Sequence, residues 1–334
     1  MQAIIAKDGP ESLAIIQDPR PSGKYYSKRF MNALGSANVY AHSSSCNLSK
    51  ESAYMQTMGA SNYSTDFGNA KMVMFIGRSY GDGIRPSSVQ SLASAKEAGT
   101  RIVSVDPRLN NSGIFSSDWV PINPGTDLAF ILALCNVLIE EDLYDHDFVE
   151  YWCYGFDQLA ERVRTMPPEK AAEICQVPVE KIYAAARMYA TAKPAAILWG
   201  LAVDQKTDGM QNSQCIISLQ AITGNLDRPG GQLLPGSDAG HNELGFGYKE
   251  CIPDELFQKM IGMAEYPAYC NMILNSQVDR MLETLETDEP YPIRMGFYMG
   301  DNALTNCSME PKRWRAALLR SLEFCIGFDT FMNA

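Results

Sequence analysis

A short apolar strand that ends in an acid is the feature that most constrains the fold of this chain. Residues 101–105 form an apolar run that is followed at once by Asp106. A similar run, 72–76, ends at Gly77, and residues 86–99 between the two show a helical pattern, with proline near its start and glycine at its end. Strand, helix and strand in this order predict a βαβ crossover in a parallel sheet.

A second acid follows the next motif along the chain. Residues 118–122 lead into Pro124-Gly125-Thr126-Asp127, a turn that opens a very apolar helix at Leu128. Backbone N–H groups at a helix N-terminus favour an anionic or hydrogen-bonding ligand. Buried parallel strands deliver the residues that follow them to the ligand crevice of an open α/β sheet. Asp106 and Asp127 are therefore candidate ligand-binding carboxylates.

The remaining pattern extends the same architecture. Further strands are predicted at 195–199, 294–299 and 323–328, and helices at 25–34, 156–163, 168–174, 178–191, 209–222, 255–263, 276–285 and 314–319. Residues 38–46 are polar and serine-rich, which predicts a loop. The fold class is α/β with two doubly wound, Rossmann-like parallel-sheet units. We expect residues 66–193 to form one domain, inserted into a second domain made of residues 1–65 and 194–334.

Charge and cysteine usage exclude several classes of protein. The formal net charge of −11 argues against non-specific binding to nucleic acid or to an anionic membrane. The longest apolar run, 128–139, is too short to span a bilayer. The nine cysteines include no Cys-x-x-Cys pair, so neither a zinc ribbon nor a local iron–sulfur site is expected.

Several short motifs follow one another along the chain. They are Gly35-Ser36-Ala37-Asn38 leading to Cys46, Phe75-Ile76-Gly77, Val105-Asp106-Pro107-Arg108, Asp118-Trp119-Val120-Pro121-Ile122, Pro124-Gly125-Thr126-Asp127, Trp199-Gly200, Thr223-Gly224-Asn225 with Pro229-Gly230-Gly231, and Gly300-Asp301-Asn302. Each motif alone is weak, but their order and spacing are specific. Over nearly its whole length the chain resembles the molybdopterin oxidoreductases of the dimethyl sulfoxide reductase family, which carry a bis-(molybdopterin guanine dinucleotide) molybdenum centre.

The resemblance implies a role for each motif. Asp106 and Asp127 would bind one guanine, because a carboxylate accepts hydrogen bonds from its ring N–H and amine. Taken alone, Asp106 reads equally well as a solvent-facing acid at a strand end, and Asp127 as a first-turn helix carboxylate. The pocket of this guanine would be shaped by Gly77, Pro107, Gly125 and Thr126. Near the other cofactor would lie Gly200, Asn225, Gly230, Gly231 and Asn302.

Cys46 is the residue that the resemblance places on molybdenum. Its setting, His42-Ser43-Ser44-Ser45-Cys46, is similar to the cysteine-ligated branch that includes polysulfide and thiosulfate reductases. A thiolate is a suitable ligand for a metal already held by dithiolene sulfurs. The alternative is an unligated loop cysteine. The implied reaction is two-electron transfer of an oxygen or sulfur atom on a small substrate, with the redox chemistry supplied by the cofactor.

The chain departs from the family pattern in places. Gly77-Arg78-Ser79 stands where a Gly-x-Asn is usual, and Ala303 where a proline commonly follows the asparagine. The family's N-terminal domain with a 4Fe–4S cluster and its C-terminal cofactor-capping domain are missing, so we expect a catalytic-subunit fragment that is inactive by itself. The full enzyme would use an iron–sulfur electron-transfer subunit and a membrane anchor subunit, in the periplasm or on the outer face of the cytoplasmic membrane.

Other interpretations stay open. A metal-free relative, of the NADH dehydrogenase large-subunit type, would keep the fold and conduct electrons without molybdenum. A nucleotide-binding module without catalysis is also compatible with the pattern. A nicotinamide dehydrogenase is a poor match, because 81–86 lacks the third glycine of a Gly-x-Gly-x-x-Gly turn.

Overall fold

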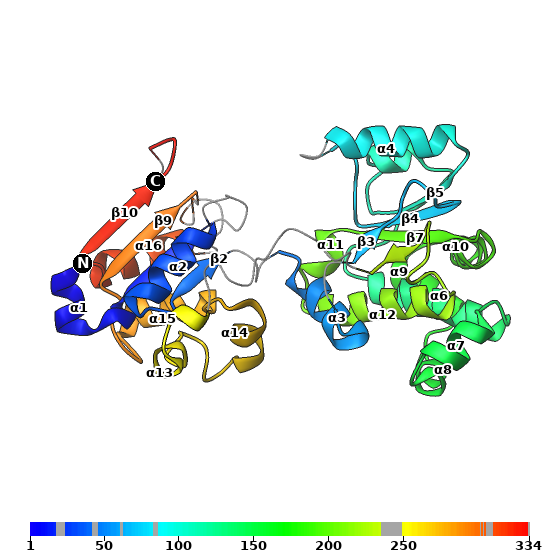
Figure 1. Ribbon diagram of the computed structural model, residues 1–334. Helices are drawn as coiled ribbons and strands as arrows, with labels where there is room; N and C mark the ends of the chain where they lie inside the picture. The colour runs from blue at the N-terminus through cyan, green and yellow to red at the C-terminus, as the bar shows by residue number, and fades with distance from the viewer. Residues whose placement is uncertain are drawn as a thin grey trace. The chain divides into compact units, whose positions relative to one another are not determined.

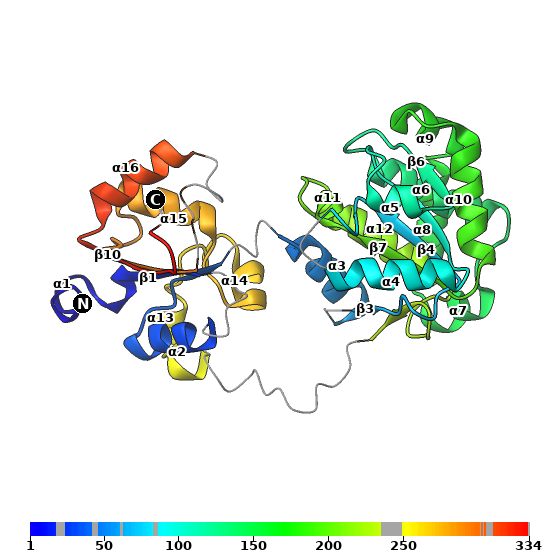
Figure 2. The same ribbon diagram turned by 90° about the horizontal axis from the view of Figure 1, so that it is seen from above.

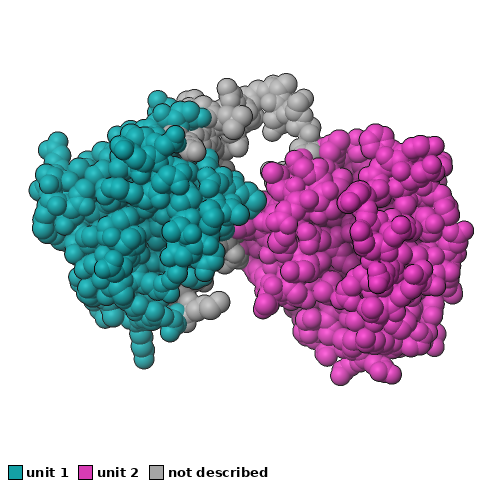
Figure 3. Space-filling view, turned by 90° about the horizontal axis from the view of Figure 1, so that it is seen from below, with its two compact units in different colours: residues 1–45, 238–334 teal, residues 46–237 magenta. Residues whose placement is uncertain are grey.

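Two parallel sheets organise the chain. The computed structural model describes residues 1–17, 24–41, 46–60, 63–82, 86–234, 249–300, 302, 304 and 310–332. The chain divides into two compact units, one of residues 1–45 and 238–334 and the other of residues 46–237 (Figure 3). Each unit contains a four-stranded sheet in which every neighbouring pair of strands is parallel. The predicted α/β class with two doubly wound units is confirmed.

The limits of the units differ from the predicted insertion of 66–193. Strand β7 (Ala195–Trp199) pairs with β4 (Met72–Ile76) over its full length. Helix α12 (Gly209–Ile222) packs against α3 (Leu48–Met58) in the same core. Strand pairing and helix packing therefore place residues on both sides of 66–193 in the 46–237 unit. Local patterns predict a strand, but they do not tell which sheet it joins.

The sheet of the 46–237 unit has the order β6-β5-β4-β7, with β5 at Arg101–Val105 and β6 at Asp118–Val120. Alternate side chains of β4 enter two cores. Met74 packs with α6 (Asp127–Glu140), α10 (Val179–Thr191) and α12, whereas Phe75 packs with α4 (Pro86–Glu97) on the opposite face (Figure 1). Since β5 and β6 extend one side of β4 and β7 the other, the strand order reverses between β4 and β7. Ligands of such sheets bind at this switch point, outside the carboxyl ends of the strands.

Shorter elements complete the unit. They are α5 (Asn111–Phe115), α7 (His146–Trp152), α8 (Phe156–Arg164), α9 (Pro168–Cys175), α11 (Leu201–Asp204) and the antiparallel pair β3 (Ser64–Thr65) and β8 (Gln232–Leu233).

The other unit is built around β1 (Leu13–Gln17), in the order β10-β9-β1-β2. Helices α1 (Gln2–Asp8) and α2 (Lys24–Leu34) cover one face, and α15 (Val278–Thr287) and α16 (Pro311–Ser321) cover the other (Figure 2). Its other elements are β2 (Val39–Ala41), β9 (Met295–Met299), β10 (Phe324–Phe328), α13 (Asp254–Phe257), α14 (Pro267–Ile273) and the 3-10 turns Pro10–Ser12 and Lys249–Cys251. No helix in the described parts of the chain is long and apolar enough to cross a bilayer.

Three local expectations need correction. The predicted loop 38–46 begins with β2, a buried strand paired with β1, and the remaining residues 42–45 lie outside the described part of the chain. Neither β1 nor α3 was predicted. The predicted helix 255–263 is reduced to the four-residue α13, and Gly262 downstream has a φ of +89°, which is incompatible with a continuing helix.

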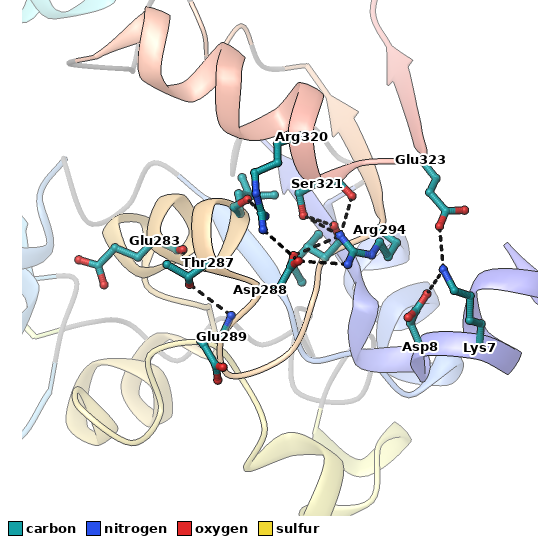
Figure 4. A network of polar contacts seen from close by, with 12 residues as sticks. Lys7, Asp8, Glu283, Thr287, Asp288, Glu289, Arg294, Arg320, Ser321 and Glu323 are labelled. Carbon is teal, nitrogen blue, oxygen red and sulfur yellow. Dashed lines mark hydrogen bonds and ion pairs between the residues drawn. The ribbon is translucent and has the colours of Figure 1, made fainter.

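Asp288 ties together α15, β9 and α16 in the unit that contains β1 (Figure 4). It receives two hydrogen bonds from Arg294, of 3.1 and 3.2 Å, and one of 3.2 Å from Arg320. Burial tends to raise the pKa of the Asp288 carboxyl, but the hydrogen bonds from the two arginines outweigh it and lower the pKa. The network joins the C-terminal end of α15 to the segment that enters β9.

We expect Asp288→Asn to lower the free energy of unfolding by about 1–2 kcal/mol at pH 7, because it removes charge-assisted hydrogen bonds. Asparagine tolerates the φ of +64° found at this position. Since the native pKa is depressed, the stabilisation is complete above the unfolded pKa of about 3.9 and is lost as pH falls through the native pKa. Urea unfolding from pH 7 down to pH 3 measures this, and Glu289→Gln is the control. A pH-independent difference between Asp288→Asn and wild type would contradict it.

Candidate cofactor site

The carboxyl edge of the β4–β7 sheet gathers most of the predicted residues. Because the strands are parallel, the segments that follow them all leave at this edge. Gly77 follows β4, Asp106 and Pro107 follow β5, Gly125, Thr126 and Asp127 follow β6, and Gly200 follows β7.

Two glycine backbones touch at the switch point. Gly77 donates its N–H to Val105 O (2.9 Å), and Gly200 donates to Ile76 O (3.0 Å). A Cβ atom at Gly200 would lie 2.2 Å from Gly77 O. Gly77 itself has a φ of +56°, and a Cβ there would lie 2.9 Å from the Ala202 side chain. Both positions therefore require glycine for the strand ends to close together.

Asp106 uses one carboxylate oxygen in a local hydrogen bond and leaves the other available. It is 9% exposed, and its Oδ1 accepts the N–H of Arg108 at 2.9 Å. Its carbonyl accepts the indole N–H of Trp119 at 2.8 Å, and Lys181 in turn donates to Trp119 O at 2.6 Å. Oδ2 has no donor among the described residues, so it can accept a hydrogen bond from a ligand.

Asp127 has a partner that the sequence did not suggest. As the first residue of α6 it is buried, and its carboxylate pairs with the ammonium of Lys206, which also lies 3.9 Å from Asp208. Thr126 Oγ1 donates to Asn123 O at 2.7 Å. The Cβ position of Gly125 faces open space. A ligand that binds Asp127 would have to share this carboxylate with Lys206 or displace the ammonium.

Hydrogen bonds connect the loop after β4 with the loop after β5. The Asp82 carboxylate accepts hydrogen bonds from Ser79 Oγ and from Asn111, at 3.1 Å from the backbone N and 2.6 Å from Nδ2. The Ser79 hydroxyl and the Asn111 N–H lower the pKa of Asp82. Tyr80 N donates to Ser112 Oγ at 2.7 Å. These hydrogen bonds join the two loops on this side of the edge.

Cys46 lies four residues before Lys50, a residue at the same edge. Cys46 is half-buried and free, and it lies two residues before the first residue of α3. Lys50, in the first turn of α3, donates to Trp199 O (3.2 Å) at the carboxyl end of β7, and its Nζ lies 4.2 Å from the centre of the Trp199 ring. The structure therefore brings the start of α3 to the edge that carries Asp106 and Gly200.

Burial lowers the pKa of Lys50 from its ordinary value of 10.5 to about 8; Asp204 opposes the shift and Arg78 adds to it. Between pH 8 and 10.5 the unfolded chain therefore binds more protons at Lys50 than the folded chain. We expect the stability of wild type to rise over this range by about 2 kcal/mol relative to Lys50→Met, once partial exposure is allowed for. Urea unfolding at pH 7 to 10 measures the difference, with the exposed Lys71→Met as control. Parallel pH profiles for wild type and Lys50→Met would contradict it.

Asn225, Gly230 and Gly231 lie at the opposite, amino edge of the sheet. Asn225 Oδ1 accepts the N–H of Ala195 (3.1 Å), the first residue of β7, and its Nδ2 donates to Thr223 Oγ1 (2.9 Å). A Cβ at Gly230 would lie 2.4 Å from the Pro194 ring, and one at Gly231 would lie 2.3 Å from Asn225 O. These residues form a hydrogen-bonded turn that anchors the start of β7. Their contact with a cofactor stays a prediction.

Asn302 belongs to the other unit and follows β9. Its Oδ1 is buried without a partner among the described residues, and it lines a pocket of 850 Å³ beside β10 and α16. Within the described residues, no group of three or more His, Cys, Asp and Glu could hold a metal ion. A metal bound through Cys46 would therefore need ligands other than the described His, Cys, Asp and Glu side chains.

The chain matches a known protein family over most of its length. The family model described as molybdopterin oxidoreductase matches residues 1–308. The chain belongs to the molybdopterin oxidoreductase family, as its motifs indicated, and the family implies a molybdenum–pterin cofactor.

Its relatives differ in the reaction that their names state. Acetylene hydratase of Syntrophotalea acetylenica is 30% identical over 100% of this chain and 48% of its own length. The thiosulfate reductase molybdopterin-containing subunit PhsA of Salmonella typhimurium is 33% identical over 88% and 40%. The structure of acetylene hydratase from Pelobacter acetylenicus aligns with a TM-score of 0.87 at 29% identity, over 99% of this chain and 48% of that one. The chain spans about half the length of these relatives.

Proposed function

We propose that this chain is the central part of the catalytic subunit of a molybdenum oxidoreductase. It would bind molybdopterin guanine dinucleotide and transfer an oxygen or sulfur atom on a small substrate in a two-electron reaction. One observation carries the proposal: in a chain that the family model matches over residues 1–308, Asp106 has a carboxylate oxygen at the carboxyl edge of a doubly wound sheet that no described residue pairs with.

The residues at this edge fit such a cofactor. A guanine offers a ring N–H and an amine to a carboxylate, and Asp106 Oδ2 has no donor among the described residues to compete with them. Gly125 leaves open space beside the start of α6. When bound, the cofactor would supply the redox-active metal, and Cys46 would supply a thiolate ligand. The chain's own residues would orient the guanine beside the loops that Asp82 and Asn111 join.

The wider assembly follows from the same proposal. An N-terminal domain with a 4Fe–4S cluster, an electron-transfer subunit and a membrane anchor subunit would complete the enzyme, in the periplasm or on the outer face of the cytoplasmic membrane. Similarity to proteins named as subunits, such as the thiosulfate reductase subunit, supports the part about partners. The 334-residue chain alone would then be inactive.

Metal and nucleotide analysis of the full-length protein, produced with molybdate, tests the proposal. We expect molybdenum, and two equivalents of GMP per metal after acid hydrolysis. Asp106→Ala should reduce both contents, whereas Asp157→Ala, an exposed acid on α8, should not. Protein without molybdenum would overturn the proposal in favour of a metal-free homologue.

A hydratase is the second candidate, because acetylene hydratase matches the chain over its whole length in both sequence and structure. Hydration involves no net redox change. Assays of the full-length enzyme with acetylene, and with thiosulfate plus a reduced viologen dye, separate the two. Turnover of acetylene without dye oxidation would favour the hydratase.

A further inference from the structure

Two cations from separate elements converge at the switch point. Lys50 comes from α3, and Arg78 directly follows Gly77 at the end of β4. A Cβ atom at Gly200 would lie 3.1 Å from Arg78 Cα, and Lys50 bonds to Trp199, the residue before Gly200. Lys50 donates to the Trp199 carbonyl, which uses one of the three N–H bonds of its ammonium. The Nε of Arg78 is buried and has no acceptor among the described residues. Donors are thus left over on both side chains.

The carboxylates near Lys50 and Arg78 do not accept hydrogen bonds from these donors. Asp204 of α11 is 3% exposed, and its Oδ1 accepts from Ser213 Oγ at 3.2 Å. Its Oδ2 is buried without a donor within hydrogen-bond distance among the described residues. Glu51, beside Lys50, accepts from Asn47 at 2.8 Å instead. Neither Lys50 nor Arg78 forms an ion pair with a described carboxylate.

Burying a cation whose N–H donors have no acceptor costs free energy, unless a ligand accepts their hydrogen bonds. An arginine and a lysine together suit an anion with several oxygens, since the guanidinium forms paired hydrogen bonds and the ammonium acts as a point charge. The crevice outside β4 and β7 is where doubly wound sheets hold the phosphates of dinucleotides. A pyrophosphate has both the charge and the span to contact two such groups.

We propose that Lys50 and Arg78 form a clamp for the pyrophosphate group of the dinucleotide cofactor. This inference rests on the proposed function, and it assigns a role to the Gly77-Arg78-Ser79 sequence, where the chain departs from Gly-x-Asn. In this view the buried carboxylate of Asp204 offsets part of the positive charge of the two cations before the ligand binds. Lys50 and Arg78 are binding residues, and they act through phosphate oxygens only.

Titration calorimetry on the 334-residue chain tests the clamp, with inorganic pyrophosphate, guanosine 5′-diphosphate and inorganic sulfate as probes. We expect Lys50→Gln and Arg78→Gln each to weaken pyrophosphate binding at least about tenfold. Lys50→Arg should restore most of the affinity. The matched controls Lys71→Gln and Arg101→Gln remove the same charges at the amino edge and should change the affinity less than about twofold. Thermal unfolding of each variant shows whether it is folded.

The probes separate this inference from the proposed function. If guanosine 5′-diphosphate binds equally well to wild type, Lys50→Gln and Arg78→Gln, the clamp is wrong and the proposed function stands. If pyrophosphate binding depends on both residues but the full-length protein contains no guanine nucleotide, the anion site is real and the proposed cofactor is wrong. Sulfate bound as tightly as pyrophosphate, or no binding of pyrophosphate by folded wild type, would overturn the clamp.

Discussion

Replacing Cys46 by alanine in the full-length enzyme is expected to lower kcat at least about 100-fold, because losing a direct ligand should cost no less than losing the groups that orient ligands. Cys46 is half-buried and precedes the helix whose first turn reaches the carboxyl edge of the sheet. The direct measurement is X-ray absorption at the molybdenum edge. Alanine should remove one sulfur neighbour, and Cys46→Ser should replace that sulfur with oxygen.

Cys153→Ala is the matched control for this experiment. Cys153 is also half-buried and free, and burial raises the pKa of its thiol. It lies at the C-terminal end of α7, and nothing in the described chain connects it with the carboxyl edge of the sheet. Its removal should leave both kcat and the metal spectrum unchanged. An unchanged spectrum in Cys46→Ala would reject the thiolate ligand, whatever happens to activity.

Gly200→Ala is expected to lower the free energy of unfolding by more than about 3 kcal/mol. The added Cβ would lie 2.2 Å from Gly77 O, a backbone atom in the closed end of the sheet. A backbone atom cannot move aside as a flexible side chain can, so relief requires β4 and β7 to separate. Gly200 itself has extended φ and ψ angles that any residue adopts, so the whole effect should come from the clash.

Urea unfolding of the 334-residue chain measures this loss. Gly68→Ala provides the control, because Gly68 is exposed in the same unit and an added Cβ there meets nothing within 4 Å. Its unfolding free energy should stay within about 0.5 kcal/mol of wild type. Equal stabilities of Gly200→Ala and Gly68→Ala would show that the strand ends are not closed as described.

Local sequence pattern was enough to predict the strands that carry the site. The apolar runs 72–76, 101–105 and 195–199 are strands with those limits. Each is short, apolar and ended by glycine or an acid, so its length and exit are set within a few residues of chain. Parallel pairing then places the residues after these strands at one edge, and for this reason Asp106 could be located without a structure.

Contacts between distant segments had no such local signal. Lys206 is 79 positions from Asp127, and the pair forms only because α6 begins beside the segment between α11 and α12. The motif that contains Asn225 was correctly predicted as a turn. The sequence did not show that this turn lies at the amino edge of the sheet, where Asn225 Oδ1 accepts the N–H of Ala195. Strand β2 was hidden by its polar sequence context, because pairing with β1 rather than composition makes it a strand.

The sequence by itself therefore determined the α/β class, the family and the residues that end each strand, since these depend on periodicity and motifs over short stretches. Only the tertiary structure decided which segments share a sheet, which carboxylate already has a cation beside it, and that Lys50 and Arg78 both lie at the switch point. The physical reason is that burial, pairing and charge compensation act between residues that are close in space, whatever their separation along the chain.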